Sequence, residues 1–314
     1  MRAVQYRYYG APLQPVDVPP PRPGANEVLI RVVAASVNPV DWKIHTGNLR
    51  LFMPQRLPVI PGFDVAGEVI AVGAGVHTFA AGDRVHARIR QQGAAAELCV
   101  AGLDVVARMP QGMDFATAAG VPLAGMTALQ ALRDVVGLPM TAATARVLVV
   151  GASGGVGHLG VQIARAAGAY VVGVCSAKNA ELVRELGAHE VIDYAAADAY
   201  AGHRPFDVVF DCVDGAPGPW LPRMTPEGRF VSAVPGPAVM FRSLINVFTG
   251  QKVSPVMLKS NAADLIVLDE LYRAGKLRVV VGARFPLAEL DAAWALSRSG
   301  RARGKIVIDV ALDA

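Results

Sequence analysis

The stretch VLVVGASGGVG, residues 147–157, decides the fold of this chain. Four apolar residues typical of a strand precede a glycine-rich turn, and an apolar run of helical type continues to about Gly168. Glycine allows the backbone to turn tightly, and the first N–H groups of a helix have no partner within it. These groups and the helix dipole favour an anion, so the stretch predicts a strand, a phosphate-binding loop and a helix.

We expect this loop to hold the pyrophosphate of a dinucleotide. The loop departs from the G-x-G-x-x-G fingerprint at Ala152, but the strand before it and the helix after it support the assignment. A glycine-rich turn that binds nothing is the alternative. The residues expected to contact the cofactor here are Gly151, Ser153, Gly154, Gly155, Val156 and Gly157.

The chain around this loop alternates short apolar runs with helical stretches. This pattern is typical of a doubly wound parallel sheet covered by helices, an α/β fold. We expect its strands at residues 147–150, 170–174, 191–192, 208–210, 230–234 and 253–258.

The chain on either side of this α/β region has a different residue pattern. Residues 1 to about 122 are rich in Gly, Pro and Val, with strand-like runs at 28–33 and 65–72. The tail contains helical patterns at 262–274 and 287–298 and a strand-like run at 305–310, which we expect to return to the first domain. The expected organisation is therefore 1–122, 123–260 and 261–314, with the last segment completing the first domain.

The composition bounds the class of protein. Of 314 residues, 53% are hydrophobic and 18% are charged, which argues against disorder. Every long apolar run is interrupted by Gly, Pro or a charge, and the first residues lack the pattern of a signal peptide. The cysteines Cys99, Cys175 and Cys212 are too scattered for a disulfide framework, so we expect a cytoplasmic protein. A net charge of +4 without a basic run excludes nucleic acid as the expected partner, and no membrane partner is indicated.

The turn after the second strand of the sheet selects the nicotinamide cofactor. A carboxylate there would bind the ribose hydroxyls of NAD, whereas this turn holds Ser176 and Lys178. A hydroxyl and a positive charge favour a 2′-phosphate, so we expect NADPH. Lys178 could alternatively be an ordinary exposed lysine.

Several ordered segments together resemble the medium-chain dehydrogenase/reductase superfamily, in particular its zinc-independent quinone oxidoreductase branch. The resemblance implies a GroES-like, β-barrel-type catalytic domain and a Rossmann NADPH-binding domain, with the active site between them. The segments, besides the glycine loop, are SVNPVDWK (36–43), PGFDVAGEV (61–69), GDRV (82–85), AGMTA (124–128) and RGKIV (303–307).

The resemblance also bears on zinc and on the reaction. Zinc-using members have a Cys where this chain has Asn38 and a His where it has Phe63, and they carry a four-cysteine lobe without a counterpart here. We therefore expect no metal site. Without a Lewis acid, simple alcohol oxidation is the weaker interpretation, and the expected acceptor is a quinone or an α,β-unsaturated carbonyl.

The resemblance implies a catalytic role for residues that follow the strand ending near residue 37. Asn38 is expected to donate a hydrogen bond to the acceptor oxygen, Asp41 to orient its neighbours, and Lys43 to face the developing negative charge. A helix-capping Asp41 and an exposed Lys43 are the structural alternatives.

The remaining expectations concern the cofactor, the histidines and the assembly. Thr127 is expected near the nicotinamide ribose, Tyr194 against the adenosine phosphate, and Val213 and Val234 beside the ribose and nicotinamide, although both valines could simply pack. The six histidines show no metal spacing and are expected at the surface. Relatives in this branch imply a homodimer, with 230–234 and 253–258 as candidate edge strands.

Two alternative functions remain open at this point. One is an enoyl reductase that acts on a biosynthetic intermediate, and it would differ in the pocket formed by residues 49–57 and 241–249. The other is a non-catalytic sensor that binds NADPH without turnover.

Overall fold

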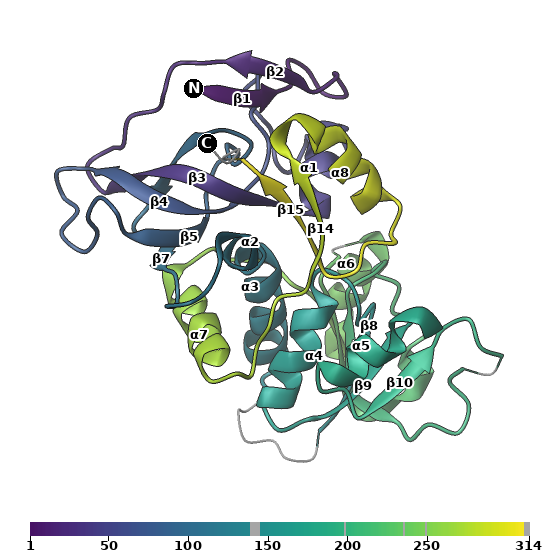
Figure 1. The fold of residues 1–314 in the computed structure, drawn as a ribbon. Helices are drawn as coiled ribbons and strands as arrows, with labels where there is room; N and C mark the ends of the chain where they lie inside the picture. The colour runs from purple at the N-terminus through teal and green to yellow at the C-terminus, as the bar shows by residue number, and fades with distance from the viewer. Residues whose placement is uncertain (139–144, 198, 235, 249, 311–314) are drawn as a thin grey trace. The chain divides into compact units, whose positions relative to one another are not determined.

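The computed structural model describes residues 1–138, 145–197, 199–234, 236–248 and 250–310, and its chain divides into two compact units (Figure 1). The first unit comprises Met1–Leu123, Ser260–Glu270 and Val279–Ala314, and the second comprises Ala124–Lys259 and Leu271–Arg278. The expected boundaries lie within one residue of these at both junctions, 122/123 and 260/261. The difference is the stretch 271–278, which belongs to the second unit. Residues 311–314 of the expected last segment lie outside the described residues.

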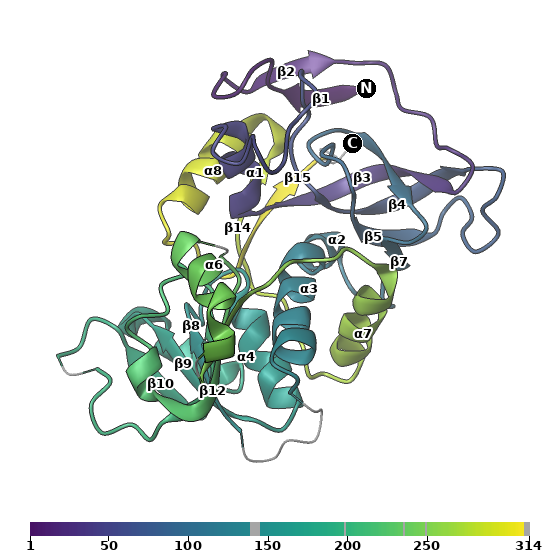
Figure 2. The same ribbon diagram turned by 180° about the vertical axis from the view of Figure 1, so that it is seen from behind.

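The second unit is built on a six-stranded sheet of order β10-β9-β8-β11-β12-β13, in which every neighbouring pair is parallel. The chain starts at the centre with β8, runs outward to β10 and then continues on the other side, as a doubly wound fold requires (Figures 1 and 2). The fold class expected from the sequence is therefore confirmed. The strands are β8 Arg146–Val150, β9 Tyr170–Cys175, β10 Glu190–Asp193, β11 Phe206–Asp211, β12 Met224–Ser232 and β13 Lys252–Pro255.

Close packing between helix and sheet explains two glycines of this unit. A Cβ on Gly160 would lie 2.8 Å from the Phe210 ring, and one on Gly173 would lie 2.4 Å from a methyl of Val183. Helix α4 can therefore approach the sheet only because Gly160 has no side chain. The helices are α3 Pro122–Gln130, which begins in the first unit, the π-helical turn Ala131–Val135 that follows it, α4 Gly157–Ala166, α5 Ala180–Glu185 and α6 Pro237–Leu244.

One expected edge strand is not at an edge. The strand β12 contains residues 230–232 and pairs with β11 on one side and β13 on the other. Position along the chain does not reveal this, because edge and inner strands of a parallel sheet are both apolar. Among the two segments named from the sequence, only the one that forms β13 is at the edge of the sheet.

The first unit contains a two-stranded and a seven-stranded sheet, and β3 is the centre of the larger one. Strand β3 pairs with β4, β6 and β15, so the strand near the C-terminus returns to the first unit as expected. The strands are β1 Arg2–Gln5, β2 Gln14–Asp17, β3 Glu27–Val37, β4 Asp64–Val72, β5 Arg84–Arg88, β6 Leu98–Gly102, β7 Val106–Arg108, β14 Val281–Pro286 and β15 Lys305–Asp309.

The core of the first unit is aliphatic, with Trp294 as its largest buried side chain. The alternation of buried and less buried residues along the first half of β3 is typical of a strand with one face in the core. Its helices are α1 Pro39–His45, α2 Phe115–Ala119, the first part of α7 Ala262–Arg273, and α8 Leu290–Arg298.

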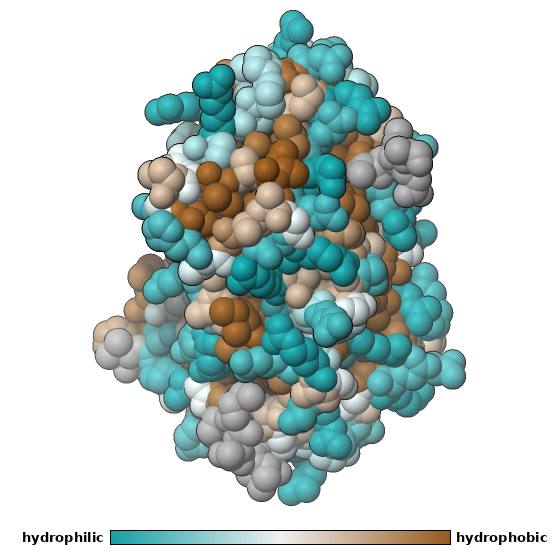
Figure 3. All heavy atoms as spheres, turned by 60° about the vertical axis from the view of Figure 1, so that its left-hand side comes forward, coloured by the Kyte–Doolittle hydropathy of each residue, from teal (hydrophilic) through white to brown (hydrophobic). Residues whose placement is uncertain are grey.

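Within the described residues, no helix has the length and apolar character needed to cross a bilayer. The face drawn in Figure 3 shows apolar side chains scattered among hydrophilic ones, which is ordinary for a protein surface.

Candidate functional site

The candidate cofactor residues of the second unit follow one strand end after another. Because all six strands are parallel, their carboxyl ends lie along one edge of the sheet. The glycine loop follows β8, Ser176 and Lys178 follow β9, Tyr194 follows β10, Val213 follows β11, and Val234 follows β12. The topology thus gathers on one edge residues that span 84 positions of the chain, from 151 to 234. Thr127 lies instead within α3, where it is 6% exposed.

The glycine loop is anchored on the neighbouring strand. The N–H groups of Gly151 and Ala152 both donate to the carbonyl of Val174, at 3.0 and 2.9 Å. Gly151 has a φ of +76°, and a Cβ on Gly157 would lie 2.1 Å from the Gly151 carbonyl oxygen. Both positions therefore require glycine, and the turn from β8 into α4 is as tight as the sequence predicts.

The same loop offers donors for an anion. No described residue accepts a hydrogen bond from the backbone N–H groups of Ser153, Gly155 or Val156. These groups stand at the N-terminus of α4, where the helix dipole is positive. The loop therefore has the properties of a pyrophosphate site.

Asn179 joins the glycine loop to the turn after β9. Its side-chain Nδ2 donates to the hydroxyl of Ser153 at 3.0 Å and to that of Ser176 at 3.3 Å. Sequence reasoning missed this residue, because the only signal was an asparagine in a turn, and nothing in the spacing linked it to Ser153.

The turn after β9 presents a positive charge. Lys178 is exposed, and no described carboxylate lies within ion-pair distance of it. The carboxylate nearest in the sheet register is Asp193, whose strand position pairs with Cys175. Asp193 accepts the N–H of Ala195 at 3.1 Å and so closes its own turn.

A buried carboxylate organises the next two strand ends. Asp211 accepts the N–H groups of Val213 at 3.0 Å and Gly215 at 2.7 Å, and the hydroxyl of Ser232 at 2.8 Å. Ser232 in turn accepts the N–H of Val234 at 3.0 Å. Burial raises the pKa of Asp211, and the three donors partly offset this effect. No residue pattern singles out Asp211, although it fixes the loops that carry both candidate valines.

In the first unit, the three candidate catalytic residues lie at α1, with Asn38 and Asp41 at its start and Lys43 in its last turn. Asn38 follows β3 and is the N-cap residue, and its backbone N–H donates to Asp41 Oδ2 at 2.7 Å. Asn38 and Asp41 are buried, at 2% and 1% exposure. Lys43 is partly exposed, with its ammonium 5.6 Å from the centre of the Trp42 ring and no described carboxylate in ion-pair range.

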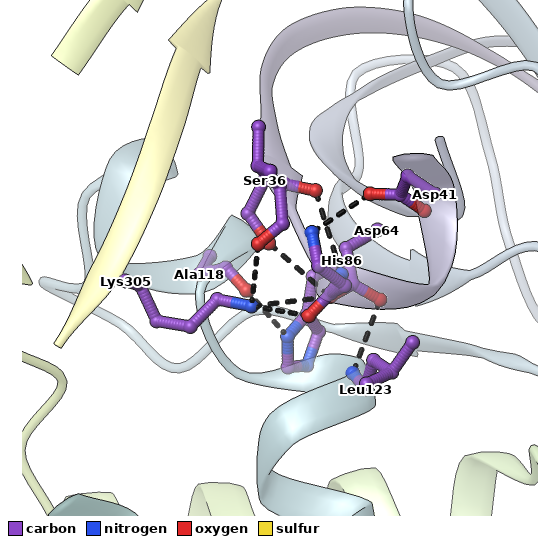
Figure 4. A network of polar contacts seen from close by, with 9 residues as sticks. Ser36, Asp41, Asp64, His86, Ala118, Leu123 and Lys305 are labelled. Carbon is purple, nitrogen blue, oxygen red and sulfur yellow. Dashed lines mark hydrogen bonds and ion pairs between the residues drawn. The ribbon is translucent and has the colours of Figure 1, made fainter. Parts of the chain in front are cut away.

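The side-chain amide of Asn38 is already engaged within the protein. Its Nδ2 donates to Asp64 Oδ2 at 2.8 Å, and its Oδ1 accepts from Lys305 Nζ at 2.6 Å. Asp64 also accepts the hydroxyl of Ser36 at 3.2 Å and the N–H of Leu123 at 3.0 Å (Figure 4). The ammonium of Lys305 lies 3.8 Å from Asp64 Oδ2. The second N–H of the Asn38 amide has only a long contact of 3.5 Å, to the Ser36 carbonyl.

Burial shifts the ionisation of this network. It raises the pKa of Asp41 to about 7, because the hydrogen bond from the Asn38 N–H only partly offsets the lost solvation. Burial also raises the pKa of Asp64 and lowers that of Lys305, and their mutual attraction opposes both shifts. Asp41 Oδ1 has no hydrogen-bond partner among the described residues, and Asp41 lines a small cavity beside Trp294.

The positions that hold zinc ligands in zinc-using members carry other chemistry here. Asn38 is bound to Lys305, and the Phe63 ring lies under the guanidinium of Arg88, 4.8 Å from the ring centre. No group of three or more His, Cys, Asp or Glu residues suited to a metal ion occurs within the ranges that the structure describes.

The expectation that the histidines lie at the surface is wrong for three of the six. His45, His86 and His158 are at most 7% exposed. His86 contacts Asp269 at 3.2 Å, and this buried pair joins β5 to α7. A histidine can be buried where its ring finds hydrogen-bond partners, and a single sequence does not show which histidines find them.

Two protein-family models match the chain. Residues 24–139 match the alcohol dehydrogenase GroES-like domain, and residues 186–308 match a zinc-binding dehydrogenase family. The chain is 41% identical to a chloroplast envelope quinone oxidoreductase homolog of Arabidopsis thaliana over 323 residues, covering 98% of each chain. It is 33% identical to an NADPH-dependent alkenal/one oxidoreductase of the same plant, over 90% of this chain and 72% of the relative. The structure of the quinone oxidoreductase from Coxiella burnetii superposes with a TM-score of 0.88 at 31% identity, covering 99% of both chains.

These relatives correct one expectation. Both plant relatives are described as chloroplast proteins, and other similar proteins are described as chloroplastic or mitochondrial. The expectation of a cytoplasmic location is therefore wrong, because the relatives are described as proteins of organelles. Scattered cysteines are compatible with any reducing compartment and do not distinguish among them.

Proposed function

The chain belongs to the medium-chain dehydrogenase/reductase superfamily, in its quinone oxidoreductase group, and on this premise we propose that it reduces a quinone or an α,β-unsaturated carbonyl with NADPH. That it is an oxidoreductase dependent on a nicotinamide cofactor follows from its relatives. The choice of NADPH and the roles of individual residues are the proposal.

The observation that carries the proposal is the edge of the parallel sheet. Ser153, Gly155 and Val156 offer a pyrophosphate backbone N–H groups that have no acceptor among the described residues, and Gly155 has no side chain that would block its approach. Lys178 and the Ser176 hydroxyl, on the next strand end, suit the 2′-phosphate that distinguishes NADPH from NADH. The exposed side chains of Tyr194 and Val213 offer apolar surface to the rings of the cofactor.

The proposed roles of the first unit follow from the state of its side chains. When bound, the reduced nicotinamide supplies the hydride. Addition to a conjugated carbonyl leaves negative charge on oxygen, and the Lys43 ammonium, which has no carboxylate partner among the described residues, suits that charge. Both the nitrogen and the oxygen of the Asn38 side-chain amide are hydrogen-bonded within the protein, so we assign Asn38 an orienting role. Asp41 is the carboxylate that holds the backbone N–H of Asn38.

The test is the loss of reduced-nicotinamide absorbance with NADPH or NADH, across a panel of quinones and enones, with a strong chelator present throughout. The proposal expects rapid, chelator-resistant turnover that prefers NADPH. Loss of turnover in chelator would overturn the zinc-independent mechanism, and a preference for NADH would overturn the assignment of Ser176 and Lys178. Tight binding of NADPH without turnover would support a sensor.

We also propose a homodimer that pairs through β13, the edge strand of the parallel sheet. Its support is the position of β13, which pairs with β12 on one side and with no strand of the described residues on the other. Asn246 binds the N–H and the carbonyl of Val253, so a second copy would have to displace this side chain or pack over it. Sedimentation of the wild type would test the proposal. A monomeric wild type would overturn it.

A further inference from the structure

We propose that Lys305 is a positioning residue, which together with Asp64 fixes the amide of Asn38 and the backbone at the start of the helix that carries Lys43. This inference rests on the proposed function for its effect on turnover. The first observation behind it is the orientation of the Asn38 amide. A lysine ammonium has only donors and a carboxylate only acceptors, so the amide oxygen must face Lys305 and the nitrogen must face Asp64. A flipped amide would meet both partners with the wrong polarity.

The second observation is that Lys305 also contacts the main chain at this point. Its Nζ lies 3.4 Å from the carbonyl oxygen of Val37, the residue before Asn38. The backbone N–H of Asn38 is held from the other side by Asp41. The turn from β3 into α1 is therefore fixed at the Val37 carbonyl, the Asn38 N–H and the Asn38 side chain, and Lys43 lies one turn further along α1.

The third observation is the placement of the charges. Lys305 and Asp64 are 2% and 0% exposed, and burying a charged pair gains little stability over a well-packed apolar pair. The network instead links β15 to the end of β3, the start of β4 and the start of α3, through Lys305, Asn38, Asp64 and Leu123. These are contacts between segments distant in the chain, and they specify one geometry for α1. Charge and hydrogen-bond direction give that specificity, whereas apolar packing does not.

The test separates orientation from charge balance. In Lys305→Met, the oxygen of the Asn38 amide loses its hydrogen-bond donor, and Asp64 loses the ammonium that balances its charge at 3.8 Å. In Lys305→Met/Asp64→Asn, both charges are removed, so most of the lost stability should return. A positioning role predicts that kcat falls about 10- to 100-fold in both variants, while the NADPH dissociation constant changes less than about threefold. Recovery of kcat in the double variant would overturn the proposal, because charge balance alone would then explain the single variant.

A matched control comes from another buried pair of the same unit, His86 and Asp269. Asp269→Asn disturbs the contact with His86 but touches neither Asn38 nor Lys305. It should lower the melting temperature and leave kcat per folded enzyme unchanged. Equal losses of kcat in Asp269→Asn and Lys305→Met would mean that general destabilisation is the cause.

Two further measurements keep the proposal testable if Lys305→Met does not fold or the wild type does not turn over. Lys305→Arg keeps the charge but cannot place the same N–H groups, so it should fold with reduced kcat; wild-type kcat would contradict positioning. The orientation of the Asn38 amide, read from its side-chain ¹⁵N resonances in wild type and Lys305→Arg, requires no substrate. Unchanged resonances would overturn the proposal, whereas absence of turnover in the wild type with shifted resonances in the variant would overturn only the proposed function.

Discussion

The side-chain amide of Asn179 donates to the Ser153 hydroxyl across 3.0 Å and so ties the turn after β9 to the glycine loop after β8. The two halves of the proposed dinucleotide site, the pyrophosphate loop and the 2′-phosphate turn, are thereby held together by one side chain. This link sets an expectation for the Asn179→Ala variant.

Asn179→Ala should raise the KM for NADPH about 3- to 10-fold and leave kcat at saturating NADPH nearly unchanged. The physical reason is that one or two neutral hydrogen bonds, each contributing about 1 kcal/mol, preorganise the two parts of the site in the free protein, so that without them NADPH must order these parts when it binds. Initial rates over a range of NADPH concentrations measure both constants. A large fall in kcat with an unchanged KM would contradict the assigned role.

Lys178→Ala should lower kcat/KM for NADPH about 10- to 100-fold and change that for NADH less than about threefold. A charge-assisted contact with a phosphate contributes about 1.5–3 kcal/mol, and NADH lacks the phosphate. The matched control is Lys276→Ala, an exposed lysine of the same unit outside the strand ends, for which the ratio between the cofactors should not change. Equal losses of kcat/KM with NADPH and NADH would show that Lys178 does not bind the 2′-phosphate.

Lys43→Met should reduce kcat for enone acceptors about 10- to 100-fold, because a positive charge near the developing enolate oxygen stabilises the transition state more than the bound substrate. Lys43→Arg, which retains the charge, should recover part of the rate. The NADPH dissociation constant, measured by fluorescence titration, should be the same in all three proteins. An undiminished kcat in Lys43→Met would leave Lys43 as an exposed lysine with no part in the reaction.

Asp41→Asn should flatten the dependence of stability on pH. The pKa of Asp41 is raised from 3.8 to about 7 in the folded protein, so between these values the folded state binds more protons than the unfolded state. The contribution of Asp41 to wild-type stability therefore falls as pH rises from about 4 to 7, and the full penalty, at most about 4 kcal/mol, is present above pH 7.

The asparagine has no such penalty, and its side-chain carbonyl can still accept the Asn38 N–H. Urea unfolding at pH 6 and pH 8.5 measures the effect, and Asp41→Asn should be relatively more stable at the higher pH. Because Asp64 and Lys305 are present in both proteins, the difference between them reports on Asp41. The same change in unfolding free energy between the two pH values in both proteins would refute the raised pKa.

In the second unit, local sequence patterns predict some features of the site and miss others. The glycine loop, β8 and α4 were predictable because the strand, the tight turn and the helix depend on neighbouring residues, and the glycines have local steric reasons such as the 2.1 Å approach at Gly157. The location of Val213 and Val234 at strand ends was predictable for the same reason. Asp211 was not, because its role is to accept hydrogen bonds from loops that only the parallel pairing of β11 and β12 brings together.

The sequence by itself determined the doubly wound sheet, the return of the last strand to the first unit, and the chemical types available near α1. Hydrophobic period and turn residues are local signals, and they suffice for these features. Only the tertiary structure decided what Asn38 does with its amide and which strand lies at the edge of the sheet. Lys305 reaches Asn38 from a position 267 residues away, and the polarity of that contact exists only once β15 has paired with β3. Orientation of a buried polar group depends on all its partners at once, and partners brought together by strand pairing leave no spacing in a single sequence.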